Sequence, residues 1–232
     1  MAVAFPRIEF LTLDVVPLIG HIPRHNVTFE VYDFTRKLLL EDGSQDIVFL
    51  NGALEIVRDY RTLLHEVYRV LRPGGLIHFS DFNPNFWDPE DTTTPARRTN
   101  PRGCEYFDVV RGRLSAMGID PNTCDKVPEW LAPGSDLWSE GEKGFQDIRS
   151  DIRTYPAYPH DGFPCMGQVG TEISMYIRHL FVQSTGDGLG LLKDAGMAHD
   201  DACRLIEDVI EEMKQPERCS LIKLYRIYAT KI

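Results

Sequence analysis

The sequence predicts a single α/β domain in which helices cover a mostly parallel sheet. Residues 26–82 combine short apolar stretches, typical of strands, with one strongly amphipathic helix between two of them. A strand followed by a helix and another strand implies a right-handed crossover between parallel strands. A length of 232 residues suits one domain with a substantial core. We therefore expect one α/β domain over residues 1–232.

Two strands are expected in the first 34 residues. Residues 8–16 form an apolar run with β-branched side chains, as in a buried parallel strand, and Pro17 helps to end it. Residues 26–34 alternate apolar and polar side chains, which is typical of a half-buried strand nearer a sheet edge. Asp14 and Asp33 lie near the carboxyl ends of these strands.

The most regular element is a helix predicted over residues 54–71. A short apolar strand, residues 46–50, precedes it, and Asn51-Gly52 separates the two. The sequence Pro73-Gly74-Gly75 ends the helix and leads into another strand at residues 76–81. The apolar residues of the helix recur at spacings of three and four: Ile56, Val57, Tyr60, Leu63, Leu64, Val67, Tyr68 and Leu71.

The second half of the chain divides at about residue 145. Prolines and polar turns interrupt residues 83–144, and only residues 106–117 favour a helix there. This stretch is interpreted either as an insertion or lid over a site or as a plain surface excursion. Residues 145–232 are predicted to contain helices at 169–184 and 202–214 and strands at 145–155 and 221–229.

Composition narrows the classes of partner. The net charge of −10 argues against nucleic acid, because phosphate binding needs a basic surface. No apolar run approaches the roughly 18 residues of a membrane span, and residues 1–10 lack the layout of a secretory signal. We expect no membrane partner and a cytoplasmic location, although a nuclear one is compatible. The five cysteines lack metal-site spacing, so we expect reduced thiols and no metal site.

Several of these segments together resemble the class I S-adenosylmethionine (SAM) dependent methyltransferases. Residues 11–17 are similar to the second strand of that family, and residues 26–33 and 46–49 are similar to its third and fourth strands. Residues 64–76, Leu-His-Glu-Val-Tyr-Arg-Val-Leu-Arg-Pro-Gly-Gly-Leu, resemble the helix and turn before its fifth strand. Among its members, the chain is most similar to fungal methyltransferases associated with secondary metabolism.

The resemblance implies a Rossmann-like sheet with an antiparallel strand pair at its C-terminal end, and SAM bound outside the carboxyl ends of the strands. Asp14 would accept hydrogen bonds from the ribose hydroxyls. Asp33 would accept from the adenine amino group, beside an apolar wall from Phe34. Asn51 would lie where the methionine part of SAM meets the acceptor. The plainer alternatives are a solvated strand end for Asp14, a turn or cap for Asp33, and a tight Asn51-Gly52 turn.

The implied reaction is methyl transfer from SAM to oxygen or nitrogen of a small molecule. Such a transfer needs in-line positioning and, for a hydroxyl acceptor, a base. No catalytic residue is assigned. His78, in mid-strand, is interpreted as a packed core residue. Six further residues could serve the site or simply support the fold: Asp81, Trp87, Tyr106, Trp130, Trp138 and His160.

The glycine-rich turn that opens such a domain is missing from the sequence. Residues 1–7 contain no glycine, and the glycines of residues 186–190 are interpreted as a loop between helices. We therefore expect residues 8–82 to form a partial SAM-binding core without the first β-α unit, and SAM binding to be weakened. Two inner sheet edges would then meet, leave a gap or recruit a partner strand, which favours a homo- or hetero-dimer.

Three functional hypotheses follow, and the sequence leaves open whether the chain is an active enzyme. The first is a SAM-dependent methyltransferase truncated at its N-terminus, for example through a wrongly chosen start codon or exon. The second is a non-catalytic binding or scaffold partner. The third is an enzyme that reuses the pocket for another biosynthetic reaction. Retained acidic residues at Asp14 and Asp33 favour the first hypothesis.

Overall fold

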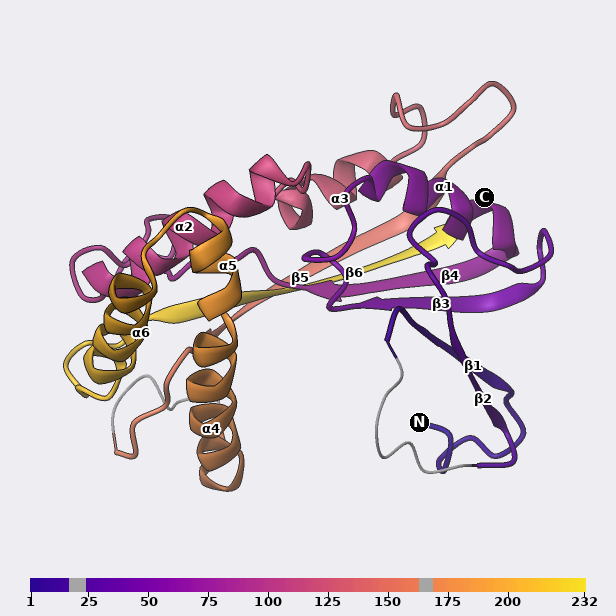
Figure 1. The fold of residues 1–232 in the computed structure, drawn as a ribbon. Coiled ribbons are helices and arrows are strands. Elements are labelled where there is room, and N and C mark those ends of the chain that lie inside the picture. Colours follow the sequence, from indigo (N-terminus) through magenta and orange to yellow (C-terminus); the bar gives the residue numbers. More distant parts are fainter. Residues whose placement is uncertain (17–23, 163–168) are drawn as a thin grey trace.

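The computed structural model describes residues 1–16, 24–162 and 169–232. Twelve elements follow one another along these ranges (Figure 1). They are β1 (Phe10–Asp14), β2 (Val27–Val31), β3 (Gln45–Asn51), α1 (Tyr60–Val70), β4 (Leu71–Asp81), α2 (Pro101–Ala116), α3 (Thr123–Leu131), β5 (Phe145–Pro156), α4 (Thr171–Asp187), α5 (Leu189–Asp194), α6 (His199–Met213) and β6 (Leu221–Lys231).

The strands form two separate sheets. β1 and β2 make a parallel pair with Phe10 opposite Val27 and Asp14 opposite Val31. The other four strands lie in the order β3-β4-β6-β5. β3 and β4 are parallel, whereas β6 is antiparallel to both of its neighbours. The α/β fold and the antiparallel C-terminal pair are confirmed. Of the three outcomes expected for the inner edges, the structure shows the gap, because β1 and β3 belong to different sheets.

Helices cover one face of the four-stranded sheet. In Figure 1, α1, α2 and α3 lie on one side of it, and the β1–β2 pair and α4 extend from the other side. The side chains of β4 alternate accordingly: Ile77 and Phe79 are fully buried, whereas Leu76 and His78 are only half-buried. β6 repeats the pattern, because Tyr225, Ile227 and Ala229 are buried and their neighbours are not. The main core therefore lies between this sheet and its helices.

Helix α1 begins later than the sequence pattern predicts. The Asp59 carboxylate accepts a hydrogen bond from the Thr62 backbone N–H at 3.0 Å, so Asp59 is the N-cap and the helix starts at Tyr60. Leu54 and Val57 precede the helix but are buried. Their apolar side chains therefore continue the spacing of the helix in the sequence, which made the predicted helix start too early. At the other end the chain becomes extended at Leu71 and continues directly into β4.

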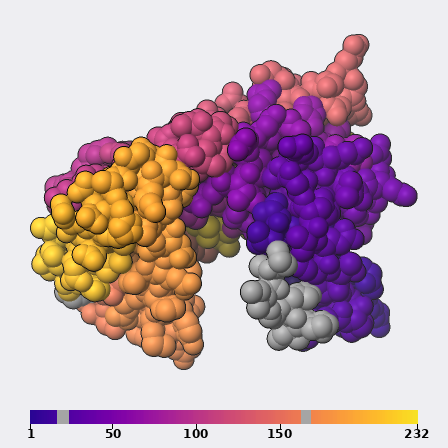
Figure 2. All heavy atoms as spheres, in the orientation of Figure 1, coloured from indigo at the N-terminus to yellow at the C-terminus, as the bar shows by residue number. Residues whose placement is uncertain are grey.

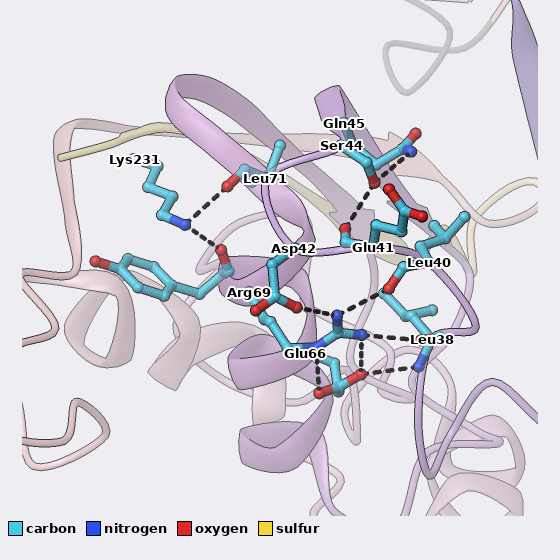
Figure 3. A network of polar contacts seen from close by, with 11 residues as sticks. Leu38, Leu40, Glu41, Asp42, Ser44, Gln45, Glu66, Arg69, Leu71 and Lys231 are labelled. Carbon is cyan, nitrogen blue, oxygen red and sulfur yellow. Dashed lines mark hydrogen bonds and ion pairs between the residues drawn. The ribbon is translucent and has the colours of Figure 1, made fainter.

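A polar cluster fastens the segment between β2 and β3 to helix α1 (Figure 3). The Arg69 guanidinium donates to the carbonyls of Leu38 and Leu40, at 2.9 and 2.8 Å, and to the Asp42 carboxylate at 2.6 Å. Glu66 pairs with Arg69 at 2.8 Å and accepts from the Leu38 N–H at 2.9 Å. Nearby, Lys231 Nζ donates to the carbonyls of Tyr68 and Leu71 at the end of α1.

The second half of the chain contains one more helix before β5 than the sequence predicts. Helix α3 was missed because Pro128 lies inside it, and proline is expected to interrupt a helix. The helices predicted over residues 169–184 and 202–214 are present as α4 and α6 with shifted ends. The interpretation of residues 186–190 as a loop was wrong, because Gly186 and Asp187 belong to α4, Leu189 and Gly190 belong to α5, and only Gly188 lies between the helices. None of the described helices combines the length and apolarity that a membrane crossing requires.

Candidate functional site

Asp14 and Asp33 lie at the same edge of the parallel β1–β2 pair. Asp14 is the last residue of β1, and its backbone carbonyl accepts from the Tyr32 N–H at 3.1 Å, just beyond the end of β2. Its carboxylate Oδ1 accepts from the Val16 N–H at 3.2 Å. Because the strands are parallel, their carboxyl ends meet at one edge, where a ligand can contact both.

The Asp33 carboxylate is engaged in its own turn. Oδ1 accepts from the backbone N–H and the hydroxyl of Thr35, at 3.1 and 2.5 Å, and Oδ2 lies 3.4 Å from the Arg36 guanidinium. The hydrogen bond from the Thr35 hydroxyl is the main reason that the pKa of Asp33 is lowered. This geometry corresponds to the turn interpretation of Asp33. Phe34 follows it and packs half-buried against the core.

Asn51 ends β3, in the other sheet. It is exposed and lies opposite Ser80, and the Gly52 N–H donates to the Ser80 carbonyl at 3.0 Å. Gly52 has φ of 60°, a backbone conformation that favours glycine, so Asn51-Gly52 forms a tight turn. The structure thus brings together Asp14, Asp33 and Phe34, whereas Asn51 is the last residue of a strand in the second sheet.

Asp81, the last residue of β4, binds the loop that follows the neighbouring strand β3. Its buried Oδ2 accepts from the backbone N–H groups of Ala53 and Leu54, at 2.8 and 2.9 Å. Oδ1 accepts from the Phe82 N–H at 2.9 Å. Burial raises the pKa of Asp81, and these three amides partly oppose the rise. Asp81 is therefore a positioning residue for the turn at the end of β3.

A polar cluster beside Asp81, in which Asn83 and Tyr225 are buried and Asp125 is exposed, has no counterpart among the residues predicted from the sequence. Tyr225 lies opposite Asp81 in the sheet, and its hydroxyl donates to Asp125 at 2.6 Å. The Asn83 amide donates to the same carboxylate at 2.7 Å, and its oxygen accepts from the Cys124 N–H at 3.2 Å. Burial, and then Asp125, raise the pKa of Tyr225. A hundred residues separate Asp125 from Tyr225, so no local spacing could reveal the cluster.

The rings of the remaining aromatic candidates pack against neighbouring side chains. The Trp138 ring contacts Tyr68 and Phe145, with centroids 4.9 and 5.6 Å away, and its N–H donates to the Ala132 carbonyl. Trp87 lies under Lys223, whose Nζ is 3.6 Å from the ring centroid. Four others also contact neighbouring side chains: Tyr106 contacts Phe107, Trp130 contacts Arg61, His160 contacts Tyr158, and His78 contacts Phe49 and Tyr228.

His78 packs against neighbouring rings, as the sequence interpretation expects, but it lies outside the main core. It is half-buried on the sheet face that the helices leave open, with ring centroids 5.3 Å from Phe49 and 4.7 Å from Tyr228. Burial, and then Arg226, lower the pKa of His78. The sequence pattern identifies a strand but not which face of it the helices cover, so the face on which His78 lies could not be predicted.

The described residues fit the adenosine end of SAM better than its methionine end. Asp14 offers a carboxylate at a strand end, as a ribose diol requires. By contrast, residues 1–9 form turns, and the buried Asn26 amide donates to the carbonyls of Ala2, Phe5 and Ile8 at 3.3, 3.2 and 2.9 Å. They contain no glycine and provide no glycine turn ahead of β1. Within the described ranges, no cluster of His, Cys, Asp and Glu side chains could hold a metal ion.

Comparison with known proteins agrees with the sequence resemblance. Residues 18–79 match a methyltransferase domain family. Secondary metabolism regulator laeA from Coprinopsis cinerea is 23% identical over 236 residues, which cover 97% of this chain and 54% of laeA. Arsenite methyltransferase from Mus musculus is 41% identical over 69 residues, 28% of this chain and 18% of that protein. The chain thus spans about half the length of the first relative and less of the second.

Solved structures add a distant likeness. The YcgJ protein from Bacillus subtilis is 17% identical, with a TM-score of 0.44, over 99% of this chain and 86% of its own. That score is too low to strengthen the assignment. The match over residues 18–79 shows that this part of the chain is similar to a methyltransferase domain, and the alignment with laeA extends along nearly the whole chain.

Proposed function

We propose that the protein binds SAM through the carboxyl edge of β1 and β2, and that its site is one for methyl transfer to oxygen or nitrogen of a small molecule. The observation that carries this proposal is the position of Asp14. It ends a parallel strand and is joined by a 3.1 Å backbone hydrogen bond to Tyr32, next to the Asp33-Phe34 turn. A carboxylate at such a strand end suits a ribose diol.

Each residue contributes a different part of the expected binding. In the part of the chain that the structure describes, Asp14 Oδ1 accepts from Val16, and no protein donor contacts Oδ2. That oxygen is available to a ribose hydroxyl. Asp33 would have to exchange its contact with Thr35 or Arg36 for one with adenine, so its contribution should be smaller. Among the described residues, no atom lies within 4 Å of where a Cβ at Gly52 would be, so the acceptor end would have space there.

SAM would supply the methyl electrophile, and the protein would hold the acceptor in line with it. Asp81 would act indirectly, because its carboxylate fixes the loop after β3 by two amide hydrogen bonds. The glycine turn that lets a backbone approach the methionine end closely has no counterpart in residues 1–9.

Calorimetric titration of the folded protein with SAM and S-adenosylhomocysteine tests this proposal. Asp14→Ala should weaken binding by about tenfold or more, since it removes a charged hydrogen-bond acceptor. Glu30→Ala is the matched control, because Glu30 is an exposed acid on the adjacent strand, opposite Leu13. Equal affinity in wild type and Asp14→Ala would show that the ligand binds elsewhere.

A non-catalytic binding role is the second candidate, and the Asp33 turn favours it. A carboxylate already held by Thr35 and Arg36 is poorly prepared to bind adenine. A folded protein that gives no heat with either ligand would support this role and contradict the first proposal.

A further inference from the structure

Glu55 lies in the loop that follows β3, where the proposed acceptor would bind. Asp81 holds the two residues before it, because its carboxylate accepts from the Ala53 and Leu54 N–H groups at 2.8 and 2.9 Å. The Glu55 side chain reaches solvent, although the protein around its carboxylate raises the pKa of Glu55 by burial, and the charge of Asp81 raises it further. Among the described residues, no cation pairs with Glu55. It is therefore a carboxylate on a firmly held loop that has no partner of opposite charge there.

The hydroxyl of Tyr106, on α2, is directed at the junction of α4 and α5. A Cβ at Gly188 would lie 2.0 Å from this oxygen, so only glycine leaves room for it. Burial, and then the charges of Glu55 and Asp187, raise the pKa of Tyr106 to about 12, so both carboxylates lie near the hydroxyl. Tyr106 is only 7% exposed, and its hydroxyl forms no hydrogen bond with any described residue. A buried hydroxyl without a partner is costly, which suits a group that a ligand completes.

Two exposed carboxylates and one buried hydroxyl thus converge from three parts of the chain. Glu55 follows β3, Tyr106 lies on α2, and Asp187 is the last residue of α4. Within the ranges that the structure describes, neither carboxylate forms an ion pair. Figure 2 shows the molecule hollowed beside α4. A small molecule can therefore approach these groups from solvent.

We propose that Glu55, Asp187 and the Tyr106 hydroxyl bind the acceptor, and that this acceptor is an amine held as its ammonium ion. The assignment rests on the proposed methyltransferase function and narrows it, because it selects nitrogen over oxygen as the methylated atom. An ammonium group donates up to three hydrogen bonds, and its positive charge balances carboxylates that have no other cation. The Tyr106 oxygen would accept one of these hydrogen bonds.

Other ligands suit this group less well. An alcohol would leave both carboxylates without a countercharge, and an anion would be repelled by them. A metal ion needs several ligand atoms at coordination distance, and no group of described His, Cys, Asp and Glu side chains provides them. An ammonium ion makes no such demand, because ordinary hydrogen-bond distances are enough.

Ligand-observed NMR titration of the full chain, without SAM, tests the amine site by itself. Benzylamine is the probe, and benzyl alcohol is its uncharged match in size and shape. Benzylamine should bind at least about tenfold more tightly, because charge strengthens a hydrogen bond to a carboxylate. Glu55→Gln should weaken its binding about tenfold, whereas Glu207→Gln, which removes an exposed acid on α6, should not. Equal affinity for the amine and the alcohol would overturn the proposal, as would equal binding by wild type and Glu55→Gln.

Two glycine substitutions test the contact with Tyr106. Gly188→Ala places a methyl group where the hydroxyl lies, so it should displace the ring and weaken benzylamine binding at least about fivefold. Gly190→Ala is the matched control, because no described atom lies within 4 Å of a Cβ there. Thermal unfolding verifies that both variants fold.

Tyr106→Phe removes the hydroxyl and keeps the ring. It should weaken benzylamine binding roughly fivefold without lowering the stability, since the hydroxyl has no hydrogen bond to lose among the described residues. Unchanged binding in both Tyr106→Phe and Gly188→Ala would show that Tyr106 only packs, and would overturn its part in the site.

Calorimetry with S-adenosylhomocysteine separates this proposal from the one on which it rests. Glu55→Gln should bind S-adenosylhomocysteine as the wild type does, because Glu55 would contact the acceptor. Glu55-dependent binding of benzylamine to a protein that does not bind S-adenosylhomocysteine would support the amine site and contradict methyl transfer. Binding of S-adenosylhomocysteine with no preference for the amine over the alcohol would contradict the amine site alone.

Discussion

At the scale of single residues, several polar side chains of this protein form hydrogen bonds with main-chain groups and so hold loops in place. Asp81 and the Glu66–Arg69 pair each bind main-chain groups of a loop that follows or precedes β3. Buried N–H and C=O groups without partners cost free energy, so side chains that satisfy them are expensive to remove. These residues therefore determine how the end of β3 and the segment before it are held.

Removing the Asp81 carboxylate should destabilise the fold. Asp81→Ala leaves the N–H groups of Ala53 and Leu54 without their acceptor, so the free energy of unfolding should fall by about 3 kcal/mol. Asp81→Asn keeps one acceptor oxygen and should cost about half as much. Urea denaturation measures both. Equal stability of Asp81→Ala and wild type would mean that the loop finds other partners.

Glu66 should contribute a pH-dependent part of the stability. Its pKa is lowered chiefly by the hydrogen bonds from Arg69, below the ordinary value of 4.5. A lowered folded-state pKa stabilises the protein above the unfolded pKa, and this contribution is lost as the pH falls through the folded value. Glu66→Gln should therefore be less stable than wild type by roughly 1 kcal/mol at pH 7.

This difference should shrink as the pH falls below about 4.5. Denaturation of both proteins from pH 7 to 3 measures it, with Glu41→Gln as an exposed control. A difference that stays constant with pH would contradict the role of the Glu66 charge.

At the scale of elements, caps and sheet edges determine where each segment starts and what it pairs with. α1 starts at Tyr60 because Asp59 caps it, and its buried side chains Leu63, Leu64 and Val67 fix its apolar face against the core. The strand-helix-strand unit β3-α1-β4 is therefore packed into the main core. Within the described ranges, β1 and β2 pair only with each other. β1 and β2 form a separate two-stranded parallel pair.

The cap of α1 gives an element-scale prediction. Asp59→Ala removes the acceptor for the Thr62 N–H and should lower the free energy of unfolding by about 1 kcal/mol. Asp59→Asn is the matched variant, because asparagine caps helices about as well, and it should retain most of the stability. Thermal unfolding compares the three proteins. If alanine and asparagine behave alike, the cap contributes nothing.

At the scale of the whole molecule, stability should be uneven between the two sheets. A two-stranded pair is marginal alone in water, whereas four strands under three helices bury a continuous core. The β1–β2 pair bears Asp14, so the proposed ligand site lies on the weaker part. Ligand binding to the folded form alone would stabilise that part by mass action.

Hydrogen exchange followed by mass spectrometry should show this difference. Backbone amides of β1 and β2 should exchange through local opening, at least about tenfold faster than those in the centre of β4 and β6. Saturating SAM should slow exchange at β1 more than at β5. Equal protection of the two sheets would show that they unfold as one unit.

The sequence by itself determined the α/β class, helix α1, the C-terminal strand pair and the carboxylates at two strand ends. Apolar periodicity and turn residues encode these features locally. Residues 64–76, taken together with the strand order and the carboxylates at strand ends, also carry the resemblance to the class I SAM-dependent methyltransferases. Helix α3 escaped because a proline lies within it.

Only the tertiary structure decided what these elements contact. It showed that β1 and β3 lie in separate sheets and that His78 lies on an open face. It also revealed that Asp125 meets Tyr225 across a hundred residues. These contacts depend on which strand faces and sheet edges are covered by segments distant in the sequence. A local sequence pattern does not contain that information.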